Sequence, residues 1–208
     1  MGRSTVVSIM VCLCLVFTVQ GQITLELSDL PQEPGVEISK TLGMNTMAAG
    51  PAGENQVWDF STIQTVMETR EIWDNPEGHP GAGTFPTSDL VMYSPAMQGF
   101  QMFVYFQLLN NNRHILGSTY VSNGTPTVAP AETNGPNFVL PCTYGDSWDF
   151  IMSVDMGETT NYDSTRYEVD AWGTVTTQYG TFESLRIRLN TTNMELPDGE
   201  TETRITYM

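Results

Sequence analysis

The chain has 208 residues, of which 40% are hydrophobic and 15% are charged, and its formal net charge at pH 7 is −16. This length suits one domain with a substantial buried core. The excess of acidic residues repels nucleic acid and anionic membrane surfaces, so both are excluded as expected partners.

The first 21 residues have the pattern of a cleaved secretory signal peptide, which would be helical. Arg3 supplies a positive start, and Thr5–Val19 follows without a charged residue. The run is shorter than the ~20 apolar residues that a membrane-spanning helix needs. Val19 and Gly21 suit signal peptidase and predict cleavage before Gln22. We therefore expect a secreted or cell-surface protein with no membrane span after cleavage, and residues 22–208 as a single domain.

Removal of the signal would leave one cysteine and a more acidic chain. Cys12 and Cys14 lie in the signal, so only Cys142 remains and no internal disulfide is expected. All 24 Asp and Glu follow the signal, against seven Lys and Arg once Arg3 is removed, which gives a net charge of −17. Burial and strand pairing must therefore stabilise the domain, and Cys142 is expected to be a small buried hydrophobic residue.

Short runs rich in β-branched and aromatic residues alternate with turn residues along the rest of the chain, which is typical of an antiparallel all-β domain. Turns or loops are expected at residues 30–35, 48–56, 74–86, 110–112, 123–125 and in the proline-rich stretch 125–136. Strands are expected at residues 23–27, 57–61, 65–73, 89–94, 100–109, 113–122, 144–156, 165–175, 180–192 and 202–208.

The expected fold class is all-β, with about nine to eleven antiparallel strands by the usual strand length. A meander would form either a sandwich or a strongly curved open barrel. The sequence stops inside its last expected strand, at Met208. Both a final strand and a truncated C-terminus are compatible with that ending.

The stretch Asp170–Arg188 is expected to form a β-hairpin with its turn at Gln178–Gly180. Strict alternation predicts a core face of Leu185, Ile187 and Leu189. It also predicts that Arg186 and Arg188 point away from the core and pair with acids of a neighbouring strand. The phase of Glu183 indicates an irregularity near Ser184, and Gly173 favours a bend or bulge.

The tryptophans are the candidate ligand-binding residues, because flat rings on a sheet can stack on sugars. Alternation places Trp172 on a polar face with Glu168 and Asp170, so it is expected to be partly exposed. Packing in the core is the alternative for each ring, and burial of all four would exclude a stacking platform. An apolar cavity inside a curved sheet would instead favour a lipid-like ligand. The four candidates are Trp58, Trp73, Trp148 and Trp172.

The sequence provides no catalytic constellation. His79 and His114 have no zinc ligands at the usual spacing. Ser147 follows Gly-Asp, as in one esterase family, but neither histidine follows an aspartate in the pattern that family needs. The acids between Asp146 and Asp170 form no specific carboxylate pair. No cofactor or metal is expected, although loop oxygens leave calcium as an alternative.

Three segments occur in a fixed order along the chain: "GPAGENQVWDFS" (Gly50–Ser61), "LPCTYGDSWDF" (Leu140–Phe150) and "WGTVTTQYGTFESLRIR" (Trp172–Arg188). Together they resemble a group of uncharacterised secreted all-β proteins of Bacteroidetes-type bacteria. Many members of the group continue into a sorting domain for type IX secretion. This sequence differs in having Gln178 where proline is usual and no sorting domain after Met208. The resemblance implies export but assigns no catalytic residues.

The sequence therefore favours an exported, non-catalytic surface or interaction domain. A carbohydrate- or small-ligand-binding β module is the alternative, and a secreted hydrolase is the third possibility. The expected partners are a glycan, an apolar small ligand or a surface protein.

Overall fold

A computed structural model describes residues 22–43, 48–155, 160–196 and 200–208. The expected signal peptide, residues 1–21, lies outside these ranges. Within them, no helix has both the length and the apolar character needed to cross a bilayer.

The regular secondary structure of the described chain is almost entirely β-strand, as expected. Two short 3₁₀ helices interrupt them, η1 (Leu27–Asp29) and η2 (Ala82–Thr84). The strands are β1 (Thr24–Leu25), β2 (Val36–Gly43), β3 (Gly53–Asp59), β4 (Thr65–Asp74), β5 (Leu90–Tyr93), β6 (Phe100–Leu109), β7 (Asn112–Ser122), β8 (Thr125–Thr133), β9 (Cys142–Thr143), β10 (Ser147–Asp155), β11 (Thr160–Thr177), β12 (Gly180–Leu196) and β13 (Glu200–Tyr207).

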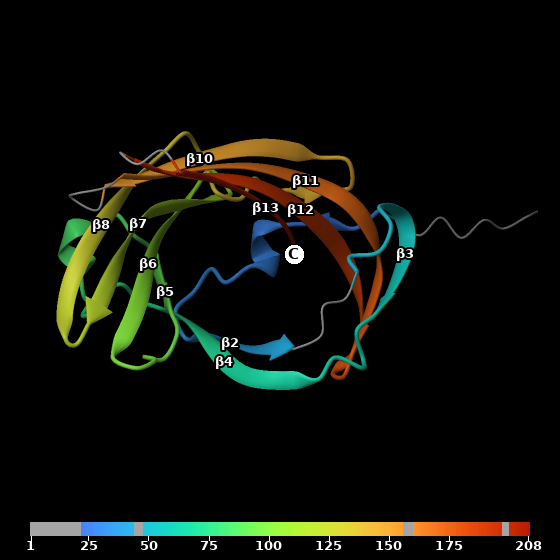
Figure 1. The fold of residues 1–208 in the computed structure, drawn as a ribbon, viewed down its shortest axis with the longest axis horizontal. Helices are drawn as coiled ribbons and strands as arrows, with labels where there is room; N and C mark the ends of the chain where they lie inside the picture. The colour runs from blue at the N-terminus through green and yellow to red at the C-terminus, as the bar shows by residue number, and fades with distance from the viewer. Residues whose placement is uncertain (1–21, 44–47, 156–159, 197–199) are drawn as a thin grey trace, which may run out of the picture.

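One strongly curved, open sheet dominates the structure (Figure 1). Its order is β13-β12-β11-β10-β8-β7-β6-β5-β4-β2, so most neighbours are consecutive in sequence, as the expected meander requires. All of these neighbours are antiparallel, whereas β3 pairs parallel with the end of β11 that β10 does not cover. The fold class predicted from the sequence is therefore confirmed as a curved open sheet, with one parallel pair added.

Three predictions about single strands were wrong. The loop expected at residues 48–56 contains the first four residues of β3. β2 was not expected, but it pairs along its whole length with β4. The proline-rich stretch was expected to be a loop, yet its first nine residues form β8. Pro126 and Pro130 pair with β7 on one side, while β10 reaches only Ala131–Thr133 on the other. The prolines are tolerated because this part of β8 is an edge.

The predicted turns lie where their residues can adopt positive φ. Asn110 and Asn111 have φ of 53° and 58°, and Asn123 has φ of 48°. These values suit tight hairpins, in which asparagine is favoured.

The two faces of the curved sheet bury different hydrophobic clusters. On the face covered by the loop that contains η2, Phe85 stacks on Tyr105 with ring centroids 4.6 Å apart. The opposite face carries Trp73, Leu90 and Phe106. That face continues into a cluster of Phe138, Leu140, Cys142, Trp148, Val169 and Ile187, against which Leu25, Leu27 and Leu30 pack. The N-terminal segment thus fills the inside of the curve (Figure 1).

The long hairpin of β11 and β12 contains a β-bulge between Val169 and Ala171. The sequence had placed an irregularity near Ser184, but the extra residue is Asp170 on the facing strand. Ile187 is buried with Leu185 and Leu189 packed beside its cluster, so the predicted core face is confirmed. The predicted pairs also form, Arg186 with Asp170 and Arg188 with Glu168, both at 2.8 Å. The prediction that Arg186 points away from the core is wrong, however, because its side chain is buried.

Gly173 is needed because the backbone of β3 lies directly against it. A Cβ atom on Gly173 would be only 1.9 Å from the carbonyl oxygen of Gln56. The residue therefore permits the parallel pairing of β3 with β11, rather than marking the bulge itself.

We predict that Gly173→Ala destabilises the protein by about 1–3 kcal/mol, the usual cost of overpacking, because β3 must move away from β11. Gly83→Ala is the matched control, since a Cβ there meets nothing within 4 Å. Urea unfolding of both variants measures the difference, and equal stability of the two would contradict the role assigned to Gly173.

Cys142 is buried, as expected, with 2% of its surface exposed. Burial raises the pKa of its thiol to about 11, and the nearby Asp146 carboxylate adds to the rise. We predict that iodoacetamide at pH 8 leaves the native protein unmodified, because the reactive thiolate is scarce and shielded. In the protein produced as residues 22–208, where Cys142 is the single cysteine, mass spectrometry should show one added group only after denaturation. Rapid labelling of the native protein would refute this.

Candidate functional site

A notch opens in the sheet where β5 ends before its neighbours. β5 has four residues, whereas β4 and β6 have ten each. β5 pairs only with residues 72–74 of β4, so the stretch 65–71 pairs with β2 on one edge and with no described strand on the other. This second edge of β4 faces the loop after β5, and we call the space between them the β4 notch.

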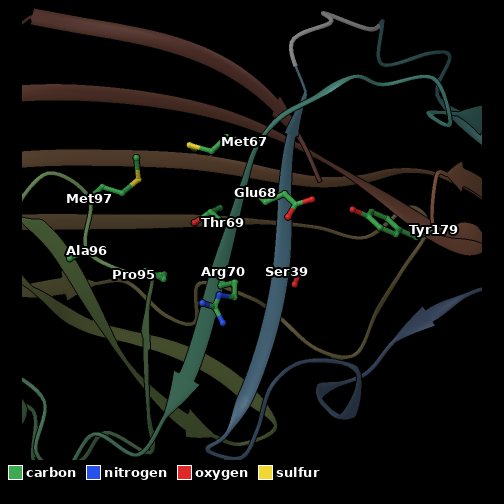
Figure 2. Close-up of a pocket in the computed structure, with 9 residues that line it drawn as sticks. All are labelled: Ser39, Met67, Glu68, Thr69, Arg70, Pro95, Ala96, Met97 and Tyr179. Atoms are coloured by element: carbon green, nitrogen blue, oxygen red, sulfur yellow. The ribbon is translucent and has the colours of Figure 1, made fainter.

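The β4 notch has a volume of about 710 Å³ and a mixed lining. Figure 2 shows Met67 and Thr69 extending from β4 toward Met97, and Glu68 extending to the other side toward Tyr179. Its lining residues are Ser39, Met67, Glu68, Thr69, Arg70, Pro95, Ala96, Met97 and Tyr179. Tyr179 belongs to the turn between β11 and β12, so two distant parts of the sheet order meet here.

The loop that forms the far wall of the notch is fixed by short contacts. Met97 and Phe100 exchange two backbone hydrogen bonds of 2.9 Å across a turn in which Gln98 and Gly99 have positive φ. The side-chain amide of Gln101 donates to the Ser94 carbonyl oxygen at 2.9 Å. The loop is thereby held to β6, and the opening lies on the β4 side.

The two charged residues that line the notch, Glu68 and Arg70, differ in whether an ion pair neutralises them. Arg70 is neutralised by Glu37, with 2.7 Å between Nη1 and Oε1. Glu68 is exposed and forms no ion pair or hydrogen bond with the described part of the chain. The lining therefore has one uncompensated negative charge.

A second hollow, the Trp58 groove, has a volume of about 560 Å³ and a mainly apolar lining. Its lining residues are Ala48, Ala49, Trp58, Phe60, Ile63, Val175, Ser184, Leu185, Arg186, Ile205, Thr206 and Met208. Arg186 is buried there, bonded to Asp170 and to the carbonyl oxygens of Ala49 and Gly50. Its guanidinium lies 5.7 Å from the Trp58 ring centroid.

All four candidate tryptophans are buried, with 3–9% of their surface exposed. The expected partial exposure of Trp172 is therefore wrong. The bulge at Asp170 shifts the alternation by one residue, so Trp172 pairs with Leu185 and shares its core-facing side. None of the rings presents an open face on which a sugar could stack.

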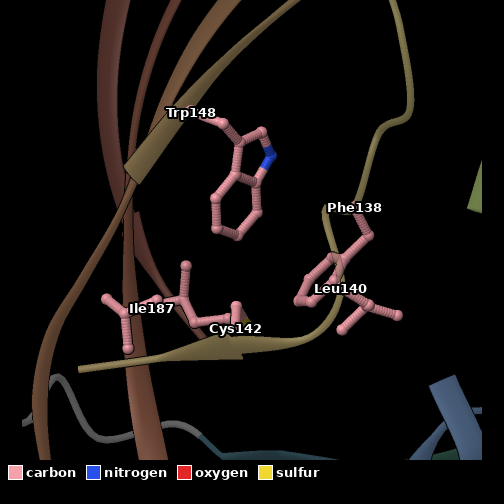
Figure 3. Close-up of a cluster of buried hydrophobic side chains, with 6 residues drawn as sticks. Phe138, Leu140, Cys142, Trp148 and Ile187 are labelled. Carbon is pink, nitrogen blue, oxygen red and sulfur yellow. The ribbon is translucent and has the colours of Figure 1, made fainter. Parts of the chain in front are cut away.

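Trp148 and Trp73 are parts of the interior. Figure 3 shows Trp148 above Phe138, Leu140, Cys142 and Ile187. The Trp148 ring also stacks on Tyr167, with centroids 4.9 Å apart and 7° between the planes. Trp73 Nε1 donates to Glu71 Oε1 at 2.8 Å. Trp58, by contrast, lines the Trp58 groove.

Arg113 joins the two inner clusters, a role that the sequence analysis missed. Its guanidinium lies 5.3, 5.1 and 5.8 Å from the ring centroids of Trp73, Phe106 and Phe138. Burial lowers the pKa of this guanidinium, and the nearby Glu71 carboxylate partly offsets the effect. The burial of an arginine at the start of a strand could not be predicted from the sequence, because the rings around it come from two other strands and a loop.

The residues weighed for catalysis are engaged in structural contacts. The Ser147 hydroxyl accepts a hydrogen bond of 2.6 Å from Arg166. His79 Nε2 lies 3.4 Å from Asp74 Oδ2, and the His79 ring packs on Tyr93. In the described ranges, no group of three or more His, Cys, Asp or Glu side chains is placed to hold a metal ion.

No protein-family model, curated protein or solved structure matches the chain.

We predict that Arg113→Met changes the free energy of unfolding by less than about 1.5 kcal/mol, because methionine fills the cage without a buried charge. Glu71 would keep its bonds from Trp73 and Lys40. Arg113→Ala should cost about 3 kcal/mol through the cavity it leaves. Urea unfolding measures the free energy of unfolding of both variants. An equal loss of stability in Arg113→Met and Arg113→Ala would show instead that the charge of Arg113 stabilises the contact between the clusters.

Proposed function

We propose that the protein is an exported, non-catalytic interaction module that binds its partner through the β4 notch. The signal-like N-terminus and the acidic composition support export and a soluble surface role. The lack of a recognisable catalytic motif in the sequence supports a binding role rather than an enzymatic one.

The free edge of β4 is the observation that carries the proposal. Its backbone N–H and C=O groups at residues 65–71 have β2 on one side only. Unpaired strand edges attract other chains, and proteins normally protect them with prolines, charges or covering loops. Here the edge instead faces a walled space with two exposed methionines, Met67 and Met97, at 36% and 54% exposure. Methionine adapts its shape and is frequent on binding surfaces.

The Trp58 groove supports a second candidate function, the binding of a small apolar ligand. The indole Nε1 of Trp58 is buried and has no hydrogen-bond partner in the described ranges. An apolar lining with a few polar groups is typical of small-molecule sites.

Two matched variants separate these functions. Met97 and Met208 are both 54% exposed, and they line the notch and the groove respectively. We predict that peptides selected from a random display library bind the purified protein and lose at least about tenfold in affinity in Met97→Glu. Met208→Glu should leave their affinity unchanged.

The groove is assayed on the same variants with the apolar dye 1-anilinonaphthalene-8-sulfonate. If binding of the dye is lost only in Met208→Glu and no peptide is selected, the small-ligand function replaces the interaction module. Selected peptides that are insensitive to Met97→Glu would exclude the notch as their site.

A further inference from the structure

We infer that the partner of the β4 notch is an extended polypeptide segment in which apolar and basic residues alternate, and that it binds by adding a strand to β4. This inference rests on the proposed function and specifies the chemistry of its partner.

The backbone of β4 sets the first requirement. A row of N–H and C=O groups at strand spacing is complementary to another extended backbone, and strand addition to such an edge is a common mode of peptide recognition. The open row covers residues 65–71, and four of these residues, 67–70, line the notch. Glycans and apolar small molecules cannot match such a regular series of donors and acceptors.

The side chains of β4 set the second requirement, because successive residues of a strand point to opposite faces. Met67 and Thr69 share one face with Glu71 and Trp73, and Met97 completes the apolar wall on that side (Figure 2). Glu68 and Arg70 share the other face. An added strand would therefore place every second side chain against the methionines and the intervening ones beside Glu68.

The charges select the intervening residues. Arg70 is already neutralised by Glu37, so Glu68 is the charge that an added side chain meets. The whole chain carries a net charge of −16, which attracts cations over a longer range. Lysine or arginine at the intervening positions would pair with Glu68 and would also be attracted by the negative net charge of the chain.

The wall of the notch also limits the partner to a single segment. Among the other free edges of the described sheet, those of β2 and β13 are its outer ends in the strand order, and that of β8 carries Pro126 and Pro130. The edge of β4 is instead faced by Pro95, Ala96 and Met97. An isolated extended segment has no neighbouring strands that would collide with this wall. The edge strand of an intact sheet in a second copy of the chain carries such neighbours.

The test uses three short synthetic peptides and the purified protein. The first alternates leucine with lysine, the second is its fully backbone N-methylated form, and the third alternates leucine with glutamate. We expect binding of the first only, with slower amide hydrogen exchange at residues 67–71, and weaker binding at higher salt. Glu68→Lys should weaken binding of the leucine–lysine peptide about tenfold. Glu132→Lys is the matched control, because Glu132 is exposed on β8, with β7, β6 and β5 between it and β4.

Each contrary result overturns a different part of the inference. Equal binding of the N-methylated peptide would exclude strand addition while leaving the interaction module in place. Equal binding of the leucine–glutamate peptide, or an equal effect of Glu68→Lys and Glu132→Lys, would exclude the charge argument. If these peptides and the display library all fail to bind, the proposed function itself fails.

Discussion

The short length of β5 is the constraint on which the notch and the shape of the surrounding sheet depend. β5 starts after the loop that contains η2, and it ends at Tyr93, just before Ser94 and Pro95. Proline has no N–H for a ladder bond and restricts the residue before it, so pairing stops there. β4 and β6 continue past this point, and the loop after β5 closes back on β6. The edge of β4 is left uncovered as a direct consequence.

The far end of the sheet reaches the same place through a second constraint, the bulge in β11. Asp170 is the extra residue, and Arg186 holds it through two bonds of 2.8 and 2.9 Å while also binding the carbonyl oxygens of the segment before β3. β-Bulges increase local twist and bend a strand. The hairpin beyond the bulge carries Tyr179 at its turn to the notch. One partly buried ion pair thus joins the segment before β3 to the bulge that bends the hairpin.

The sequence predicted the fold well where local patterns decide it. Alternation placed Leu185, Ile187 and Leu189 in the core, and the asparagines marked two hairpin turns, because both features depend on neighbours in the chain. The position of Trp172 could not be predicted in this way, since one extra residue at Asp170 reverses every later side chain. β8 was missed because its prolines are acceptable only on an edge, and edges are set by the strand order. The same reason explains the candidate site: Pro95 signals the end of a strand, but only the structure shows that β4 continues beyond it.

Amide hydrogen exchange in the free protein, read residue by residue along β4, tests the central claim that this edge is open. Within residues 67–71, amides that point toward β2 should exchange slowly, and the intervening amides, which point into the notch, should exchange close to the rate of an unstructured chain. Residues 72 and 73 pair on both sides and should be protected throughout. Uniform protection of residues 67–71 would contradict the account, because it would mean that another segment already covers the edge.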